Sequence, residues 1–226
     1  CLRKARYKGK FEFTYVSVSQ VIVKELATGM KVAIKSDYGL EITKINIYQD
    51  RYIVAHTSDT LLLGDLESSR LSEVQWRGSG KEKYDFSNPR VCMIFNAGEL
   101  TLIEYGSNEI LGSCRTEQMN PHLISARLNY SRVKTEEDYH KAVKVIAFLL
   151  DPNTICVQDL STGNSIALIN HDTRIDFIEL NASATKLLFR DKKRVLHLFN
   201  IKTQNRSTLL NFCNYVQWVP ESDVVV

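Results

Sequence analysis

The residues of this sequence that could support acid–base, nucleophilic or metal chemistry are few and scattered. His171 stands beside Asp172, Ser79 lies between two glycines, and residues 136–138 are three consecutive carboxylates, Glu136, Glu137 and Asp138. Neighbouring residues of a strand point to opposite faces, so His171 and Asp172 cannot readily form a base and its orienting acid. Ser79 lacks the G-x-S-x-G pattern, and a metal ion needs ligands at defined geometry rather than a charge run. We therefore predict no catalytic residue, no metal and no cofactor.

The cysteines give no sign of a disulfide framework or a zinc site. They are odd in number, far apart and without a C-x-x-C pair: Cys1, Cys92, Cys114, Cys156 and Cys213. Buried thiols in a reducing compartment are the expected interpretation. With 226 residues and 44% hydrophobic content, the chain is long enough and apolar enough to form a substantial globular core.

Two basic clusters are the main candidate binding features. The first is Arg3, Lys4, Arg6, Lys8 and Lys10, and the second is Arg190, Lys192, Lys193 and Arg194. Either could attract an acidic protein, an anionic membrane or nucleic acid. A solvated strand edge and a solvated turn are the simpler interpretation, which we rank first, followed by an acidic protein, a lipid surface and, last, nucleic acid. The net charge of +3 is too small to indicate nucleic acid by itself.

The elements that would carry these residues are short strands. Apolar segments rich in Val, Ile, Leu, Phe and Tyr, such as 11–18, 51–55 and 91–95, are separated by Gly-containing turns such as 96–98 and 161–163. Apolar residues keep a helical spacing only within 134–149, and weakly there. An all-β class follows.

One strand pattern recurs along the chain. Five segments align, each apolar and ending in a polar residue followed by an apolar one: 21–26, 61–66, 100–105, 155–160 and 196–201. Their fifth residues, the marker residues, are Glu25, Asp65, Glu104, Asp159 and Asn200. The markers are separated by 40, 39, 55 and 41 residues. The long interval contains 130–141, a charge-rich stretch that we interpret as a loop inserted between strands.

A period near 40 residues with several short strands per repeat is typical of four-stranded propeller blades. We therefore predict an all-β, WD-repeat-type β-propeller, a partial ring of about four to five four-stranded blades. The expected blades are 1–36 (partial), 37–78, 79–117, 118–169 with the inserted loop 130–141, 170–213 and 214–226 (truncated). The start at Cys1 and the apolar end at 224–226 favour a piece of a longer chain, and no apolar run or leader indicates a membrane or secreted protein.

The 170–201 segment resembles a WD repeat. Asn170-His171 stands where that family has Gly-His, and Asp191 falls in the turn before the third strand. The resemblance implies a buried hydrogen-bonded set in which His171 and Asp191 pair. Asp59 in the run 58–60, and Asp65 and Asp159 among the markers, occupy other blade-motif positions. No marker is preceded by Trp, so the repeats are degenerate.

Several longer runs resemble one family more closely. They include Tyr-Ile-Val-Ala-His-Thr (52–57), Cys-Met-Ile-Phe-Asn-Ala-Gly-Glu-Leu (92–100) and Tyr-Val-Gln-Trp-Val-Pro (215–220). Together they are similar to the second N-terminal propeller of a large WD-repeat subunit of the intraflagellar transport B (IFT-B) complex. The 130–141 insertion and 78–83 have no clear counterpart there.

The resemblance implies a non-enzymatic scaffold of cytoplasm and cilium, needed for cilium assembly. Its partners would be other IFT-B subunits, together with a preceding propeller and helical repeats of the same full-length chain. The alternative function is a membrane- or phosphate-binding propeller acting through the basic segments 3–10 and 190–194.

Overall fold

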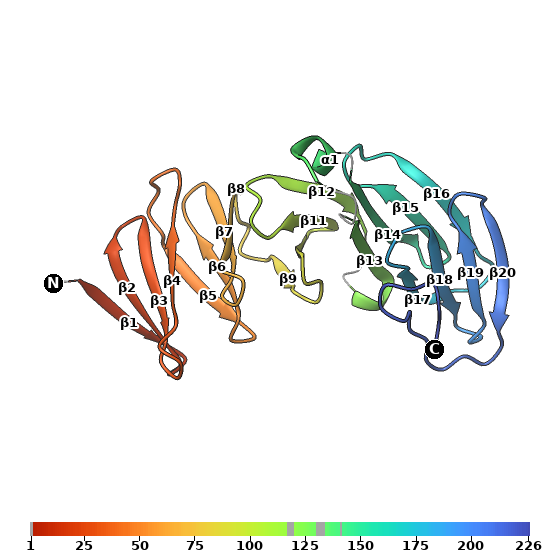
Figure 1. Cartoon of the computed structure of the whole chain (residues 1–226), viewed down its shortest axis with the longest axis horizontal. Helices are drawn as coiled ribbons and strands as arrows, with labels where there is room; N and C mark the ends of the chain where they lie inside the picture. The colour runs from red at the N-terminus through yellow and green to blue at the C-terminus, as the bar shows by residue number, and fades with distance from the viewer. Residues whose placement is uncertain (1, 117–119, 130–133, 141) are drawn as a thin grey trace. The chain divides into compact units, whose positions relative to one another are not determined.

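The computed structural model describes residues 2–116, 120–129, 134–140 and 142–226. Within these ranges the chain forms twenty strands, one 3-10 turn and one short α-helix (Figure 1). The strands make five antiparallel sheets of four strands each. No described helix has the length and apolar character needed to cross a bilayer. The predicted all-β class with four-stranded blades is confirmed.

The chain divides into two compact units, residues 1–93 with 102–110 and residues 94–101 with 111–226. The first unit holds two complete sheets, whose strands follow one another in chain order. The first sheet consists of β1 (Arg3–Tyr7), β2 (Phe11–Ser17), β3 (Gln20–Glu25) and β4 (Lys31–Lys35). The second consists of β5 (Lys44–Tyr48), β6 (Tyr52–His56), β7 (Thr60–Asp65) and β8 (Arg70–Gln75).

The third sheet contributes residues to both units and consists of β9 (Lys83–Asp85), β10 (Val91–Asn96), β11 (Glu99–Glu104) and β12 (Ile110–Arg115). The second unit holds the last two sheets. The fourth consists of β13 (Ile124–Asn129), β14 (Val143–Asp151), β15 (Thr154–Asp159) and β16 (Ser165–Asn170). The fifth consists of β17 (Ile175–Leu180), β18 (Lys186–Asp191), β19 (Leu196–Asn200) and β20 (Asn205–Leu210).

The recurring sequence pattern corresponds to one strand position in every sheet. The five aligned segments are the third strands β3, β7, β11, β15 and β19, and each marker residue is the last residue of its strand. The repeat therefore exists because every sheet reuses the same strand and the turn that follows it.

The first sheet is more complete than the sequence suggested. A partial sheet is expected over 1–36, yet β1 pairs with β2 from Arg3↔Tyr15 to Tyr7↔Phe11 and completes four strands. Lys8 and Gly9 turn the chain with φ values of 50° and 66°. Two successive positive φ values are the geometry of a tight hairpin whose twist matches its strands. The charges of β1 hid this strand, because an edge strand tolerates charged side chains that a central strand does not.

The inserted stretch lies between β13 and β14. Its described part contains α1 (Glu136–His140), a single short helix rather than a plain loop. The 3-10 turn η1 (Pro121–Leu123) precedes β13. Residues 130–133 and 141, which also belong to the predicted insertion, lie outside the described residues.

Each unit has its own apolar core. In the first unit, side chains of the first two sheets pack together, among them Phe11, Phe13, Ile34, Ile47 and Ile53. In the second, the fourth and fifth sheets share a core that includes Ile155, Val157, Leu187 and Phe189. Central strands such as β7 and β18 bury consecutive residues, so both of their faces are covered. Stacking of sheets satisfies both faces in this way.

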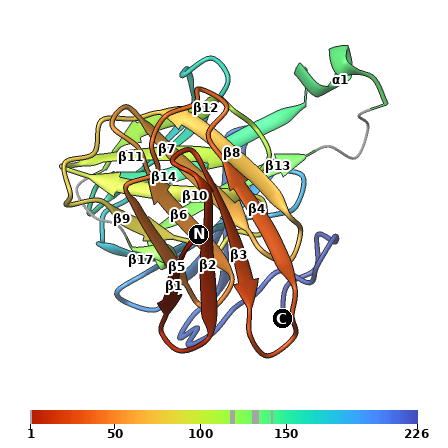
Figure 2. The same cartoon turned by 90° about the vertical axis from the view of Figure 1, so that its left-hand side faces the viewer.

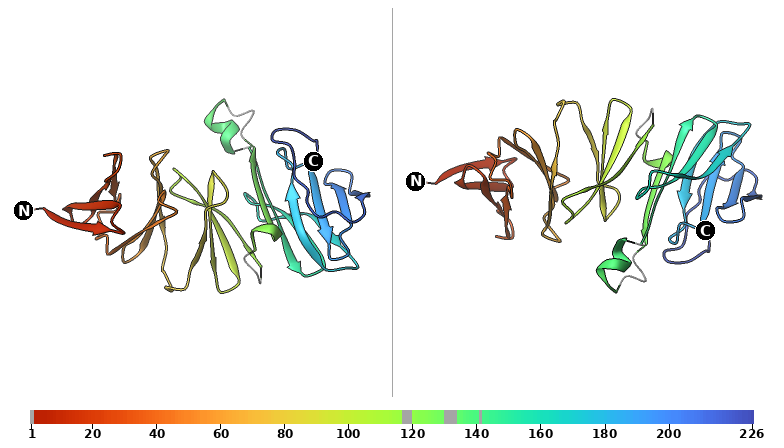
Figure 3. Two further views of the ribbon diagram at one scale, coloured as in Figure 1. Left: turned by 90° about the horizontal axis from the view of Figure 1, so that it is seen from below. Right: turned by 90° about the horizontal axis from the view of Figure 1, so that it is seen from above.

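After β20, residues 213–226 return over the fifth sheet. Gln217 and Val226 exchange two backbone hydrogen bonds of 2.9 and 3.0 Å, and Trp218 bridges to Val225. Trp218, Cys213 and Val216 pack with Leu188 and Leu196 of the fifth sheet. Figure 3 shows this last segment in dark blue beside the strands of that sheet. We propose, as the sequence suggests, that 214–226 begins a further blade.

Candidate functional site

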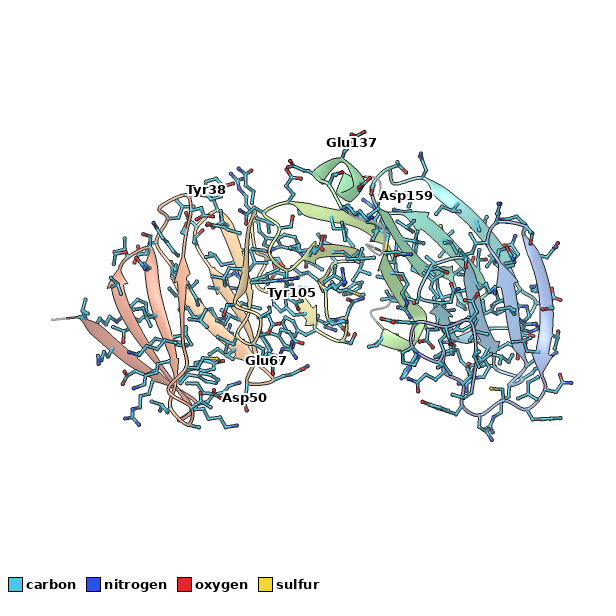
Figure 4. The ribbon with its side chains drawn as sticks, viewed as in Figure 1. Tyr38, Asp50, Glu67, Tyr105, Glu137 and Asp159 are labelled. Carbon is cyan, nitrogen blue, oxygen red and sulfur yellow. The ribbon has the colours of Figure 1, made fainter. Side chains whose placement is uncertain are left out.

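The marker residues organise the turn between the third and fourth strands. Asp159, labelled in Figure 4, accepts hydrogen bonds at Oδ1 from the backbone N–H groups of Ser161 (2.7 Å) and Thr162 (3.1 Å). Its own carbonyl accepts from the Gly163 N–H at 2.8 Å. A short polar side chain that bonds its own backbone two residues on replaces lost ladder bonds in a tight turn. The marker position is therefore a structural position.

Other markers repeat this arrangement. Asn200 Oδ1 accepts from the N–H groups of Lys202 (3.1 Å) and Thr203 (3.0 Å), and Asp65 Oδ1 accepts from Glu67 N–H (3.1 Å). The residue four positions after the marker has positive φ in four of the five turns: Gly29, Ser69, Gly163 and Gln204. In the remaining turn, after Glu104, the positive φ lies at Gly106 instead.

Asp65 also forms a salt bridge with an arginine. Arg51 Nε and Nη2 donate to its two carboxylate oxygens at 2.8 and 3.0 Å. This paired hydrogen bond is the main reason that the pKa of Asp65 lies below its ordinary value. The pair joins the β5–β6 turn to the end of β7 within one sheet.

The resemblance-based pair His171 and Asp191 lies together in the second unit. His171 Nε2 is 2.8 Å from Asp191 Oδ2, and His197 Nε2 is 3.4 Å from the same oxygen. The other carboxylate oxygen accepts from the N–H groups of Lys193 (2.9 Å) and Val195 (3.1 Å). Asp191 thus fixes the β18–β19 turn and holds two imidazoles. We call His171, Asp191 and His197 the histidine–aspartate cluster.

The cluster has the donor types of a zinc site, two imidazoles and a carboxylate. Its three ligand atoms also lie close enough together, all within 4.8 Å of one another. Its outer contacts favour a hydrogen-bonded state instead. Arg206 Nη1 lies 3.3 Å from His171 Nδ1. A guanidinium can only donate, so His171 Nδ1 accepts and Nε2 carries the proton that is donated to Asp191. Zinc ligands normally have the opposite arrangement, with the outer nitrogen donating to a carboxylate or carbonyl.

Burial and hydrogen bonding act on the cluster in opposite ways. Burial alone would raise the pKa of Asp191, but hydrogen bonds from His171, Val195 and His197 bring it below its ordinary value. Burial lowers the pKa of His197, and hydrogen bonding to Asp191 only partly offsets this. The carboxylate is therefore held ionised while His197 is biased towards its neutral form.

Sequence reasoning missed a second buried polar set. Glu73 in β8 is 3% exposed, and its carboxylate accepts from Ser36 Oγ (2.7 Å), Thr60 Oγ1 (2.7 Å) and the Asp37 N–H (2.6 Å). These contacts join the end of the first sheet to the second. Asp59, the expected motif residue here, is exposed and accepts a hydrogen bond from its neighbour Ser58 Oγ at 2.9 Å. An acidic residue in mid-strand looks like a solvent-facing one, so the sequence offered no sign of Glu73.

The residues with potential for acid–base, nucleophilic or metal chemistry are not assembled into a reactive site in the described chain. Asp172 is exposed, whereas His171 faces the cluster. Ser79 donates its backbone N–H to Glu82 at 2.5 Å in an exposed loop. In the acidic run, Asp138 N–H donates to Thr135 Oγ1 (3.2 Å) while its carboxylate accepts from Thr135 N–H (3.2 Å). This reciprocal pair is a capping box that starts α1.

Several residues of the two basic clusters are engaged locally. Arg190 pairs with Asp176 (2.8 Å), Arg194 hydrogen-bonds Asn214, and Lys192 and Lys193 are exposed in the turn between β18 and β19. In the first cluster, Lys4 lies 3.6 Å from Glu12, Lys10 lies 2.5 Å from Asp50, and Arg3 stacks over the Tyr15 ring. Arg6 is exposed on β1. The first cluster belongs to the first unit and the second cluster to the second unit.

The described cysteines, Cys92, Cys114, Cys156 and Cys213, are all buried free thiols. Burial raises the pKa of Cys114 to about 12, which removes thiolate reactivity near neutral pH. Cys1 lies outside the described residues.

The repeated four-stranded sheets and their turn-capping markers define the class: an all-β protein of WD-type propeller blades. No protein-family model matches the chain. Over its whole length it is similar to one segment of intraflagellar transport protein 172. It is 59% identical to the homologue of Danio rerio, 56% to the protein of Chlamydomonas reinhardtii and 55% to the homologue of Homo sapiens.

Each of these matches covers 228 aligned residues, 100% of this chain but only 13% of the relative. The chain thus spans a small part of the length of these relatives. Among solved structures, Hsv2p of Kluyveromyces lactis aligns with 97% of this chain and 73% of its own, at 12% identity and a TM-score of 0.39. At that level the likeness is weak.

Proposed function

We propose that the chain is part of a non-catalytic scaffold, the second N-terminal propeller of an IFT-B subunit needed for cilium assembly. The observation that carries the proposal is identity of 55% to 59% along the whole chain with intraflagellar transport protein 172 of human, alga and fish. The polar sets agree with a scaffold role, since Asp191, Glu73 and the markers each use their side chains to hold turns and sheets together.

The partners on this proposal are other IFT-B subunits, with a preceding propeller and helical repeats in the same full-length chain. The protein would act in the cytoplasm and the cilium. Blades offer many exposed loops and edges on a rigid frame, which suits docking of several partners.

The test is co-purification of the full-length protein with individual IFT-B subunits. We expect at least one subunit to be retained. Deleting residues 130–141 tests the insertion, and Lys192→Glu with Lys193→Glu tests the second basic cluster without breaking the Arg190–Asp176 pair. If the intact full-length protein retains no IFT-B subunit, the proposal is wrong.

A membrane- or phosphate-binding role through segments 3–10 and 190–194 is the alternative. Pairing of Lys4, Lys10 and Arg190 with carboxylates reduces the charge that these segments could offer to phosphate groups. Sedimentation of the full-length protein with phosphatidylserine vesicles tests this alternative. Salt-sensitive binding to vesicles that is lost with Lys192→Glu and Lys193→Glu would favour it over the scaffold.

A further inference from the structure

A polar pocket lies in the first unit, on the side of the second sheet that faces away from the first sheet. Ile45 and Ile47 of β5 pack with the first sheet, whose strands stand in front of β5 and β6 in Figure 2. Because side chains alternate along a strand, Lys44 and Asn46 point to the opposite side. His56 is directly opposite Lys44 in the β5–β6 register and therefore shares that side. These last three side chains line the pocket.

The opposite wall of the pocket is the connection between β8 and β9. The two walls are close, since a Cβ on Gly78 would lie 3.9 Å from His56 Nδ1 and 3.5 Å from Glu82 Oε1. Glu82 Oε1 accepts hydrogen bonds from the Ser79 N–H (2.5 Å) and from Trp76 Nε1 (3.4 Å), which hold this connection in place. The pocket has a volume of 300 Å³, at the lower end of the range for ligand sites. Both walls are described parts of the first unit.

The pocket is rich in hydrogen-bond donors that the chain itself does not use. The side chains of Lys44, Asn46 and His56 form no hydrogen bond with another described residue, whereas Glu82 already accepts two. The Lys44 ammonium can only donate, and the Asn46 amide and the His56 imidazole can each donate as well. An oxygen anion is the group that satisfies several converging donors at once, because it only accepts.

The charges of the pocket favour an anion with a single charge. Burial lowers the pKa of His56, while Glu82 raises it and Lys44 lowers it. Tyr48 and Tyr84 also line the pocket, but burial raises their pKa values and keeps both rings uncharged. With His56 neutral, Lys44 and Glu82 leave the pocket without net charge. A phosphate monoester carries nearly two negative charges, so Glu82 repels it more strongly than it repels a carboxylate.

We propose that this pocket, which we call the Lys44–His56 pocket, binds a carboxylate group, carried by an acidic side chain of a peptide or by a small organic acid. The carboxylate lies between the Lys44 ammonium and the His56 imidazole, and the Asn46 amide donates to it. Its charge also offsets the repulsion between Lys44 and a protonated His56, so binding tightens as pH falls. The inference goes beyond the scaffold role, because it concerns one pocket and holds whichever complex contains the chain.

The test is acetylation of the full-length protein by acetic anhydride, measured residue by residue with mass spectrometry. The carboxylate probes are a Gly-Glu-Gly peptide with both ends blocked and glutarate, and the same peptide with glutamine is the neutral probe. We expect acetylation of Lys44 to slow about fivefold at a carboxylate concentration of about four times Kd, because only the unoccupied fraction reacts. Lys31 and Lys35, two exposed lysines of β4, are internal controls and should react at an unchanged rate.

Two reciprocal variants separate binding from folding. Lys44→Gln changes an exposed side chain, and the carboxylate probes should no longer protect its His56 from diethylpyrocarbonate. In His56→Gln, protection of Lys44 from acetylation should weaken and should no longer increase between about pH 7.5 and 6.5. The matched control is His122→Gln, at an exposed histidine that does not line the pocket, and it should keep full protection of Lys44.

The probes also identify the source of the carboxylate. Protection by the glutamate peptide alone supports a peptide ligand, protection by glutarate alone supports a small organic acid, and protection by both supports the shared chemistry. Equal protection by the glutamine peptide would overturn the proposal, because charge would not be recognised. Protection by inorganic phosphate but by neither carboxylate would overturn it in favour of phosphate. Failure of every probe, or unchanged protection in both variants, would also overturn it.

Discussion

At the scale of single residues, Asp191 supports more of its surroundings than any other motif position predicted from the sequence. It binds two imidazoles and two backbone N–H groups while 3% exposed. Asp191→Asn should lower the free energy of unfolding by about 2 kcal/mol, because an amide NH2 would face the donating Nε2 of His171. Urea unfolding of the purified protein measures this. The control is Asp172→Asn, because Asp172 is exposed next to His171, and it should change stability by less than about 0.5 kcal/mol. If Asp191→Asn is as stable as the unchanged protein, Asp191 does not support the surrounding turn and histidines.

The same cluster predicts a dependence of stability on pH. Burial lowers the folded-state pKa of His197 from the ordinary 6.5, while Asp191, His171 and Arg206 surround it. Below pH 6.5 the unfolded chain takes up a proton that the folded chain resists, so stability is full above about 6.5 and decreases as pH falls towards the lowered pKa. His56 is shifted in the same direction by burial in the first unit. The urea midpoints measured at pH 7.5 and 5.5 should differ less in the double variant His197→Gln, His56→Gln than in the unchanged protein. An unaltered difference would show that neither histidine causes the pH dependence of stability.

At the scale of elements, the turn after each third strand is the feature that the sequence predicts best. Marker and turn are contiguous, so their side chain to backbone bonds are local and appear as a repeated motif. Glu73 escaped prediction because its partners Ser36 and Asp37 lie more than 30 residues away in the chain and meet it only after two sheets have stacked. Local chemistry can be predicted from a sequence, whereas contacts between sheets require the fold.

The turn geometry gives a paired prediction. Gly163 has a φ of 73° and no neighbouring heavy atom within 4 Å of the position that a Cβ would take, so Gly163→Ala should cost about 1 kcal/mol through backbone conformation alone. Ser69 occupies the equivalent position with a φ of 55°, and Ser69→Gly should be neutral or stabilising by about a few tenths of a kcal/mol, since relief of the left-handed conformation is partly offset by the entropy of glycine. Thermal unfolding of both variants measures whether each substitution lowers or raises the stability. Two changes of the same sign and size would show that the positions are not equivalent.

Between elements, Glu73 should contribute more to stability than an acidic residue in a strand ordinarily does. Glu73→Gln replaces the charged acceptor of the hydrogen bonds from Ser36, Thr60 and the Asp37 N–H with a neutral amide, and the loss of these charge-assisted bonds should cost about 2 kcal/mol. Glu67→Gln is the control, because the Glu67 side chain is 68% exposed, and it should cost less than about 0.5 kcal/mol. Chemical denaturation measures the free energy of unfolding of both variants. A Glu73→Gln protein as stable as the control would contradict the prediction that Glu73 is important for stability.

At the scale of the whole molecule, the forty-residue period predicted about four to five four-stranded sheets, because every sheet repeats one strand and turn. It could not predict that the first sheet is complete, since the charged side chains of β1 suit an edge strand. Nor could it show which face of the fifth sheet is covered by 213–226. These properties depend on neighbours in space rather than on the repeated unit itself.

Coverage of the fifth sheet can be tested through Trp218. Its ring is 6% exposed against Leu188 and Leu196, and its indole N–H donates to the Glu179 carbonyl at 3.1 Å. Trp218→Ala should destabilise this part of the second unit by about 3 to 5 kcal/mol, whereas Tyr215→Ala, at a residue that is 73% exposed, should have little effect. Stacked repeats transmit stability mainly to neighbours, so hydrogen exchange in Trp218→Ala should accelerate in β17 to β20 and stay unchanged in β1 to β4. Uniform acceleration along the chain would instead mean that the sheets unfold as one cooperative body.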